Sequence, residues 1–208
     1  MTRVTVLGVT GGAGATTLAA LIHLAYRGDP QRRPALNAHD AVAMRARLGS
    51  EPHPASRLRS VADAGRFAPQ RMDAAIAAGV LLLAAPVSAG GDEALARVLA
   101  RAGARLSSEQ LRAIGVVRVA VHGPRTGAAA ARPVPAMLLL PFDRALAAGV
   151  GIEAVWSRLA PATRSGVRQL AGQLERSVWG VGRPAGTGRA PGPDPPPRRA
   201  AAPDGRRT

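Results

Sequence analysis

A glycine-rich segment near the start of the sequence constrains the fold more than any other feature. Residues 4–9 form an apolar, β-branched run that predicts a strand, and residues 17–26 carry apolar side chains at helical spacing. Residues 8–17, which join the two, read GVTGGAGATT. Glycines in such a turn let backbone N–H groups face one anion, and the N-terminus of the following helix adds a positive partial charge. The segment therefore predicts a phosphate-binding loop; the alternative is a glycine-rich turn that holds no ligand.

The rest of the sequence alternates between strand-like and helix-like patterns. We expect further strands at residues 34–38, 58–63, 80–85, 114–121 and 136–140. We expect further helices at residues 41–48, 69–78, 92–104 and 161–179. This alternation predicts an α/β fold, with a mostly parallel sheet and helices on both faces. The longest apolar runs, residues 80–86 and 136–141, are too short for a transmembrane segment, so we expect a cytoplasmic protein.

The end of the chain differs in composition from the rest. Residues 180–208 hold seven prolines and six glycines, with only one apolar side chain larger than alanine, Val181. Such a segment buries too little apolar surface to offset the entropy lost on ordering. We therefore expect one domain at residues 1–179, followed by a disordered tail at residues 180–208.

The composition excludes several kinds of chemistry. The chain has no lysine, so its 28 cationic residues are all arginine; with 13 acidic residues, the net charge is +15. It has no cysteine, which excludes disulfides, thiolate nucleophiles and cysteine-ligated metals. The charge permits a surface for DNA or an anionic membrane, with Arg97 and Arg101 on one helix face and Arg105 just beyond. GC-rich coding is an alternative origin of the arginine excess, and 2% aromatic residues give little support to base stacking.

The four histidines show no spacing typical of a metal site. His23 lies among apolar residues of the first expected helix, which predicts a packed side chain. For His39, His53 and His122 we expect structural or solvent-facing roles.

Residues 11–19, GGAGATTLA, resemble the deviant Walker A loop of the MinD/ParA family of P-loop ATPases. The resemblance is closest to the CpaE-like and septum-site-like members that lack the loop lysines. It extends over residues 3–178: residues 61–65 resemble the family's Walker B strand, residues 80–86 the strand that leads to a base-contacting loop, and residues 136–143 the last strand. It implies a P-loop NTPase-like domain.

The resemblance also implies ATP with Mg²⁺ as the ligand. The residues that it assigns to the nucleotide are Thr10, Gly11, Gly12, Ala13, Gly14, Ala15, Thr16 and Thr17. Thr16, the first helical hydroxyl, stands where a phosphate loop places a magnesium ligand. Asp63, in the segment that resembles Walker B, is the second candidate for the magnesium site.

The sequence departs from the family pattern where catalytic charge is needed. The two loop lysines are replaced by Thr10 and Ala15, and the aspartate pair at the end of the second strand by Asn37 and His39. Each missing cation is typically worth about 10³-fold or more in phosphoryl-transfer rate. We assign no catalytic residue; the candidates are Asp40, which lies one position after the expected aspartate, and Arg66, as a substitute cation.

Three functions remain open at this point. The first is a nucleotide-dependent switch that binds ATP, with weak or absent hydrolysis, forms a homodimer and regulates a partner machine. The second is a pseudo-ATPase that binds no nucleotide and serves as a protein interaction module. The third is a basic protein that binds DNA or an anionic membrane. Retention of the glycine loop, Thr16 and Asp63 favours the first.

Overall fold

The computed structural model describes residues 2–53, 55–121 and 138–180, and its centre is a parallel sheet. The strand order is β2-β3-β1-β4-β5-β6, and every neighbouring pair is parallel. The strands are β1 (Thr2–Gly8), β2 (Pro34–Ala38), β3 (Ser56–Arg66), β4 (Gly79–Pro86), β5 (Ile114–Val119) and β6 (Leu138–Leu140). Because β1 lies between β3 and β4, its carboxyl end is at the point where open α/β sheets form their ligand crevice.

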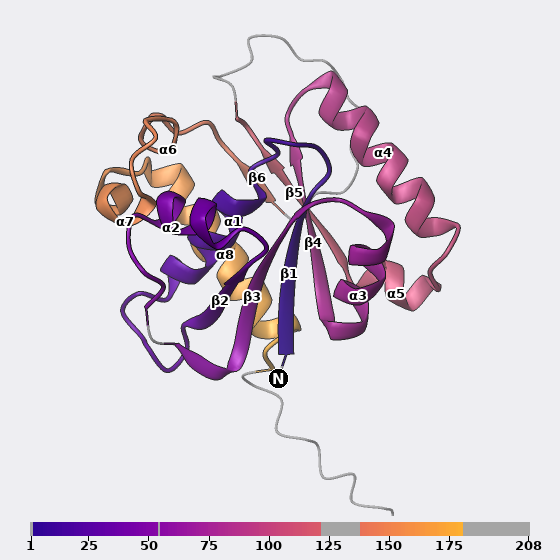
Figure 1. The fold of residues 1–208 in the computed structure, drawn as a ribbon, viewed down its shortest axis with the longest axis horizontal. Coiled ribbons are helices and arrows are strands. Elements are labelled where there is room, and N and C mark those ends of the chain that lie inside the picture. Colours follow the sequence, from indigo (N-terminus) through magenta and orange to yellow (C-terminus); the bar gives the residue numbers. More distant parts are fainter. Residues whose placement is uncertain (1, 54, 122–137, 181–208) are drawn as a thin grey trace, which may run out of the picture.

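Helices cover both faces of this sheet (Figure 1). The helices that pack on one face are α1 (Ala15–Ala25), α2 (Ala41–Leu48), α6 (Arg144–Ala147), α7 (Ile152–Val155), the 3-10 turn η1 (Trp156–Arg158) and α8 (Pro161–Ser177). Those on the other face are α3 (Pro69–Ala78), α4 (Ala89–Gly103) and α5 (Ser108–Arg112). The expected α/β architecture with two covered faces is confirmed.

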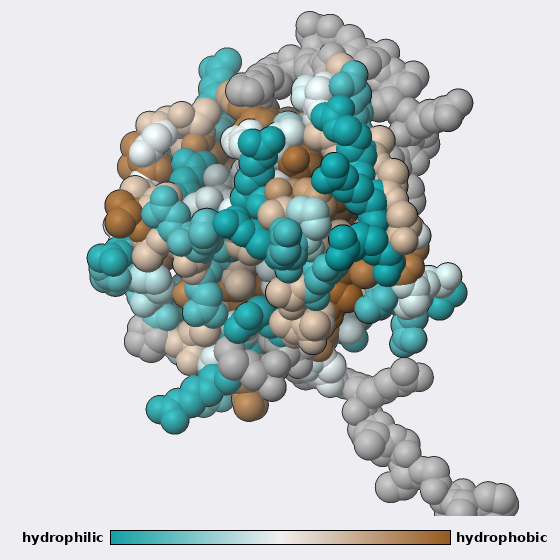
Figure 2. All heavy atoms as spheres, turned by 45° about the vertical axis from the view of Figure 1, so that its right-hand side comes forward, coloured by the Kyte–Doolittle hydropathy of each residue, from teal (hydrophilic) through white to brown (hydrophobic). Residues whose placement is uncertain are grey.

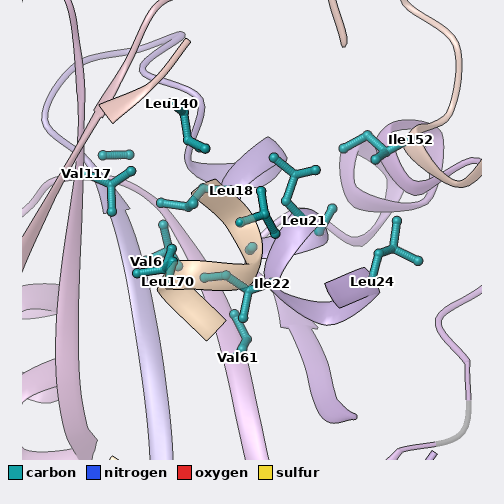
Figure 3. Close-up of a cluster of buried hydrophobic side chains, with 14 of the residues drawn as sticks. Val6, Leu18, Leu21, Ile22, Leu24, Val61, Val117, Leu140, Ile152 and Leu170 are labelled. Atoms are coloured by element: carbon teal, nitrogen blue, oxygen red, sulfur yellow. The ribbon is translucent and has the colours of Figure 1, made fainter. Parts of the chain in front are cut away.

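Two apolar clusters hold the layers together. The larger lies under α1 and α8, where Leu18, Ile22 and Leu170 are fully buried against strand residues such as Val6 (Figure 3). The smaller lies under α3 and α4 and includes the buried Met72. Aliphatic side chains dominate both clusters, as the low aromatic content requires.

The elements differ from the sequence expectations mainly at their ends. β3 is longer than residues 58–63, because pairing with β1 and β2 extends it through polar residues at both ends. α4 begins before Asp92, at Ala89, where the Ser88 side chain accepts a hydrogen bond from the N–H of Gly91. β5 ends at Val119 and α8 at Ser177. The short elements α5, α6, α7 and η1 were not expected from the sequence.

Some expectations concern residues outside those described. They are His122, the first part of the strand expected at residues 136–140, and the tail at residues 181–208. The division into a domain and a tail therefore stays a prediction. Among the described residues, no helix is long and apolar enough to cross a membrane.

Candidate functional site

The predicted phosphate loop leaves β1 and enters α1 through two glycines with positive φ. Gly12 has φ +70° and Gly14, the residue that precedes α1, has φ +87°. Both values lie in the left-handed region that glycine occupies without steric cost. A Cβ at Gly14 would also lie 3.3 Å from Val119 Cγ1, so a larger residue here would disturb the neighbouring strand. The path of the loop thus depends on glycine at these positions.

The loop leaves a row of backbone donors without partners. Among the described residues, no acceptor receives a hydrogen bond from the N–H groups of residues 10–17, whereas the flanking Val9 N–H donates to Ala84 O at 2.9 Å and Leu18 N–H to Gly14 O at 2.8 Å. A Cβ at Gly11 or Gly12 would meet no atom within 4 Å, so open space lies over the loop. Unpaired donors beside open space at a helix N-terminus form a cradle for an anion.

The two candidate magnesium residues lie in contact. Thr16 Oγ1 donates a hydrogen bond of 2.6 Å to Asp63 Oδ2, and Asp63 Oδ1 accepts one from the N–H of Gly65 at 2.9 Å. Asp63 is 4% exposed, and Thr16 is half-buried. A hydroxyl and a carboxylate at one end of the cradle are oxygen ligands of the type that Mg²⁺ prefers.

An arginine that sequence reasoning missed lies beside this pair. Arg71, on α3, donates to Ala64 O at 2.7 Å and to His39 Nε2 at 3.1 Å, and it lines the same shallow hollow as Asp63 and Asn37. Its guanidinium brings a positive charge to the edge of the candidate magnesium site. Nothing in its helical spacing distinguishes it from a solvent-facing charge, so the sequence carries no signal for this role.

A second missed arginine lies at the other end of the cradle. Arg47, on α2, donates from Nε to Thr17 Oγ1 at 2.8 Å and from Nη2 to Leu146 O at 2.9 Å. Burial lowers the pKa of its guanidinium. Arg47 and Thr17 line a mostly apolar cavity of about 80 Å³ that extends from Gly14 to Phe142, beyond the ends of β5 and β6.

The two catalytic candidates, Asp40 and Arg66, do not contact the Thr16–Asp63 pair. The Asp40 carboxylate accepts a hydrogen bond of 2.9 Å from the N–H of Ala43 and so caps the start of α2. Arg66 ends β3 and is exposed; its side chain lines a different hollow, together with Thr10. Neither candidate forms a hydrogen bond or an ion pair with the side chain of Asp63 or Thr16.

The histidines have structural surroundings. His23 is fully buried, as expected, with Nδ1 2.9 Å from Pro34 O; burial lowers its pKa. His53 Nε2 lies 2.6 Å from Glu153 Oε1, and a hydrogen bond from Ser50 is the main reason that the pKa of Glu153 is lowered. Within the described ranges, no group of three or more histidine, aspartate or glutamate side chains could hold a metal.

The fold is similar to three solved P-loop structures. In the MinC:MinD cell division protein complex of Aquifex aeolicus, 96% of the matched chain aligns with 85% of this one, at 13% identity and a TM-score of 0.61. In a ParA family ATPase from Chlorobium tepidum, 100% of the matched chain aligns with 84% of this one, at 13% identity and a TM-score of 0.57. In the septum site-determining protein MinD of Pyrococcus horikoshii, complexed with Mg-ADP, 96% of the matched chain aligns with 84% of this one, at 14% identity and a TM-score of 0.52.

The sequence comparisons give no closer relationship. No family model matches the chain, and no curated protein matches it. At 13–14% identity, likeness to solved structures establishes the fold and not the activity. The chain therefore has the fold of the MinD and ParA P-loop ATPases, with the glycine-rich loop at the carboxyl end of its central strand β1.

Proposed function

We propose that this protein binds ATP with Mg²⁺ at residues 10–17, hydrolyses it slowly or not at all, and uses the bound nucleotide as a switch that regulates a protein partner. The observation that carries the proposal is the run of backbone N–H groups at residues 10–17, which have no acceptor among the described residues. A fold that places such a cradle at the N-terminus of α1 is suited to a phosphate chain.

The residues present fit both the phosphate and the metal ion. Open space over Gly11 and Gly12 leaves room for an anion to approach the backbone. Thr16 and Asp63 offer two oxygen ligands at 2.6 Å from one another, and a cation there would replace their hydrogen bond. When bound, Mg²⁺ would neutralise phosphate charge; the chain itself would hold the nucleotide through the loop donors.

The surroundings of the cradle add positive charge without filling the loop. Arg47 contacts Thr17, and Arg71 lines the hollow that contains Asp63. Both guanidiniums are engaged with backbone carbonyl groups, at Leu146 and Ala64 respectively. The two guanidiniums therefore supply a positive potential that attracts an anion. Because both are held in place, they move little toward the negative charge that develops during phosphoryl transfer.

Slow hydrolysis follows from what the site lacks. Positions 10 and 15 carry threonine and alanine, so the loop contributes no side-chain cation. Asn37, at the end of β2, is neutral, and the Asp40 carboxylate is occupied as a helix cap. Each of the two missing loop cations is typically worth about 10³-fold or more in the rate of phosphoryl transfer. Binding relies on the backbone donors, which remain.

The role as a switch and the partner rest on likeness. One similar structure is a complex of MinD with MinC, and another contains Mg-ADP. We propose by this likeness that the chain, as a lysine-poor CpaE-like member of the family, forms a nucleotide-dependent homodimer in the cytoplasm. Loss of both lysines favours the alternative, a pseudo-ATPase that serves only as an interaction module.

Calorimetric titration with Mg-ATP tests the proposal on three proteins. Gly11→Val places a side chain in the open space over the loop, and Gly28→Val is the matched control, because Gly28 also has open space and an ordinary φ. We expect saturable binding by the parent and by Gly28→Val, and at least a tenfold weaker affinity for Gly11→Val. Absence of heat in the parent would contradict nucleotide binding and favour the pseudo-ATPase alternative.

A further inference from the structure

A second group of arginines surrounds a hollow at the outer edge of the loop. Its volume is about 240 Å³, and it is lined by Val9, Thr10, Arg66, Phe67, Ala94, Arg97, Val98 and Arg101. Three of these residues are cationic and none is acidic. The sequence suggests a charged helix face at Arg97 and Arg101 but does not indicate that Arg66 joins it.

The topology brings these side chains together from two elements. Arg66, the last residue of β3, pairs in register with Gly8, which immediately precedes Val9 and Thr10. Arg97 and Arg101 are one helical turn apart on α4, with Val98 buried beside them. Figure 2 shows this side of the molecule, where hydrophilic side chains gather along α4. The register of β3 and the packing of α4 therefore fix the hollow.

The positive charge at the hollow is largely uncompensated. The only acidic contact recorded among the described residues is with Arg97, which lies 3.8 Å from the exposed Glu93; Arg66 and Arg101 have no ion pair there. Two other arginines on this side of the sheet do have carboxylate partners, since Arg105 pairs with Asp73 and Arg118 with Asp92. Like charges one turn apart repel, so an anion between them would relieve that repulsion.

The shape of the hollow favours a compact ligand. Its floor is formed by the buried side chains of Val9, Ala94 and Val98, and Phe67 is half-buried beside them. The large apolar side chains that are most exposed in the described residues, such as Val42 and Leu139, are not part of it. A membrane surface would need such side chains to insert, and a nucleic-acid groove would need a row of aromatic stacking partners.

We propose that this hollow is a second anion-binding site, which lies beside the loop cradle and shares Thr10 with it, for a small molecule that carries a phosphate group. Arginine matches phosphate oxygens with two parallel N–H donors, and three guanidiniums around one concave floor can contact several oxygens of one group. The Thr10 hydroxyl adds a donor on the side of the loop. The site goes beyond the proposed ATP site and does not require that ATP bind there.

Inorganic pyrophosphate is the probe for this site, titrated without Mg²⁺ into the full chain. The loop is first blocked by Gly11→Val, so that binding at the cradle does not contribute. In that background we compare Arg97→Ala/Arg101→Ala with Arg168→Ala/Arg176→Ala, which removes two exposed charges from α8 on the opposite face of the sheet. Circular dichroism checks that each variant is folded.

We expect the loop-blocked protein to bind pyrophosphate. The double substitution on α4 should weaken its affinity for pyrophosphate at least tenfold, and the double substitution on α8 should change that affinity less than twofold. An equal loss of affinity in both double variants would show that only net charge matters and would overturn the proposal. No binding by the loop-blocked protein would also overturn it, while Mg-ATP binding by the parent would still stand. If a DNA duplex binds through Arg97 and Arg101 and pyrophosphate does not displace it, the hollow is part of a nucleic-acid surface and the proposal is wrong.

Discussion

The Thr16 hydroxyl donates a hydrogen bond of 2.6 Å to the Asp63 carboxylate, and this contact joins the first turn of α1 to β3 across 47 positions of the chain. It links the end of the glycine-rich loop directly to the strand that pairs with β1. Because Asp63 is 4% exposed, its charge is held in a poorly solvated place, where a bound cation would interact with it strongly.

Asp63→Asn removes that charge while keeping the shape of the side chain. If the carboxylate supports Mg²⁺, the gain in ATP affinity that Mg²⁺ gives should fall about tenfold, a change of ~1.4 kcal/mol. Titration with and without Mg²⁺ measures this gain. Asp73→Asn is the control, since Asp73 is exposed and pairs with Arg105 away from the loop. An unchanged gain in Asp63→Asn would remove this residue from the metal site.

Gly14 and Gly11 should respond differently to the same substitution. Gly14→Ala forces a side chain into a backbone with φ +87° and against Val119, so we expect the free energy of unfolding to fall by about 1–2 kcal/mol. Gly11→Ala enters open space at an ordinary φ and should change it by less than about 0.5 kcal/mol. Urea denaturation of both variants makes the comparison; equal losses would contradict the loop geometry.

Arg47 should contribute to both the fold and the cradle. Arg47→Ala removes the hydrogen bonds to Thr17 and to Leu146 O, and we expect a loss of about 1–3 kcal/mol in the free energy of unfolding. The same change should weaken Mg-ATP binding about tenfold, because a charge beside the cradle is lost. Arg45→Ala, which breaks only the exposed pair with Glu51 on the same helix, should cost less than about 1 kcal/mol and leave binding unchanged.

The sequence predicted those strands and helices whose hydrophobic pattern is complete within one segment of the chain. Apolar runs indicate β1 and β4, and helical spacing of apolar residues indicates α1 and α8. The glycine-rich loop has a composition that few other turns share. The start of β3 was missed because Ser56 and Arg57 are polar, and their strand conformation depends on long-range contacts such as the pairing of Ser56 with Pro34 on β2.

The sequence indicates the loop backbone and two side chains of the candidate site, and it does not indicate the arginines beside them. Thr16 and Asp63 could be named because Thr16 follows the glycine-rich loop and Asp63 ends an apolar strand pattern. Arg47 and Arg71 could not, because an arginine on a helix gives no sign of whether it faces solvent or folds back over a neighbouring loop. The same applies to Arg66, whose place beside Arg97 and Arg101 is set by strand register and helix packing.

His23 should make stability depend on pH. Burial lowers its pKa below the ordinary value of 6.5, so between the two pKa values the unfolded chain binds more protons than the folded one. Its contribution to stability is therefore present above pH 6.5 and is lost as the pH falls toward the lower, folded value. We expect His23→Asn, which keeps a donor for Pro34 O but does not titrate, to flatten the pH dependence between pH 7 and 5, measured by urea denaturation at each pH.

The central claim, that the loop holds ATP but lacks the charges for fast hydrolysis, is tested most directly by a single-turnover experiment. Protein in excess is mixed with Mg-ATP labelled at the γ-phosphate, and retained nucleotide and released phosphate are measured over time. We expect the nucleotide to be retained on the protein, with phosphate released at less than about 10⁻³ s⁻¹. Release at about 1 s⁻¹ or faster would contradict the account, because it requires a catalytic cation that the loop does not contain.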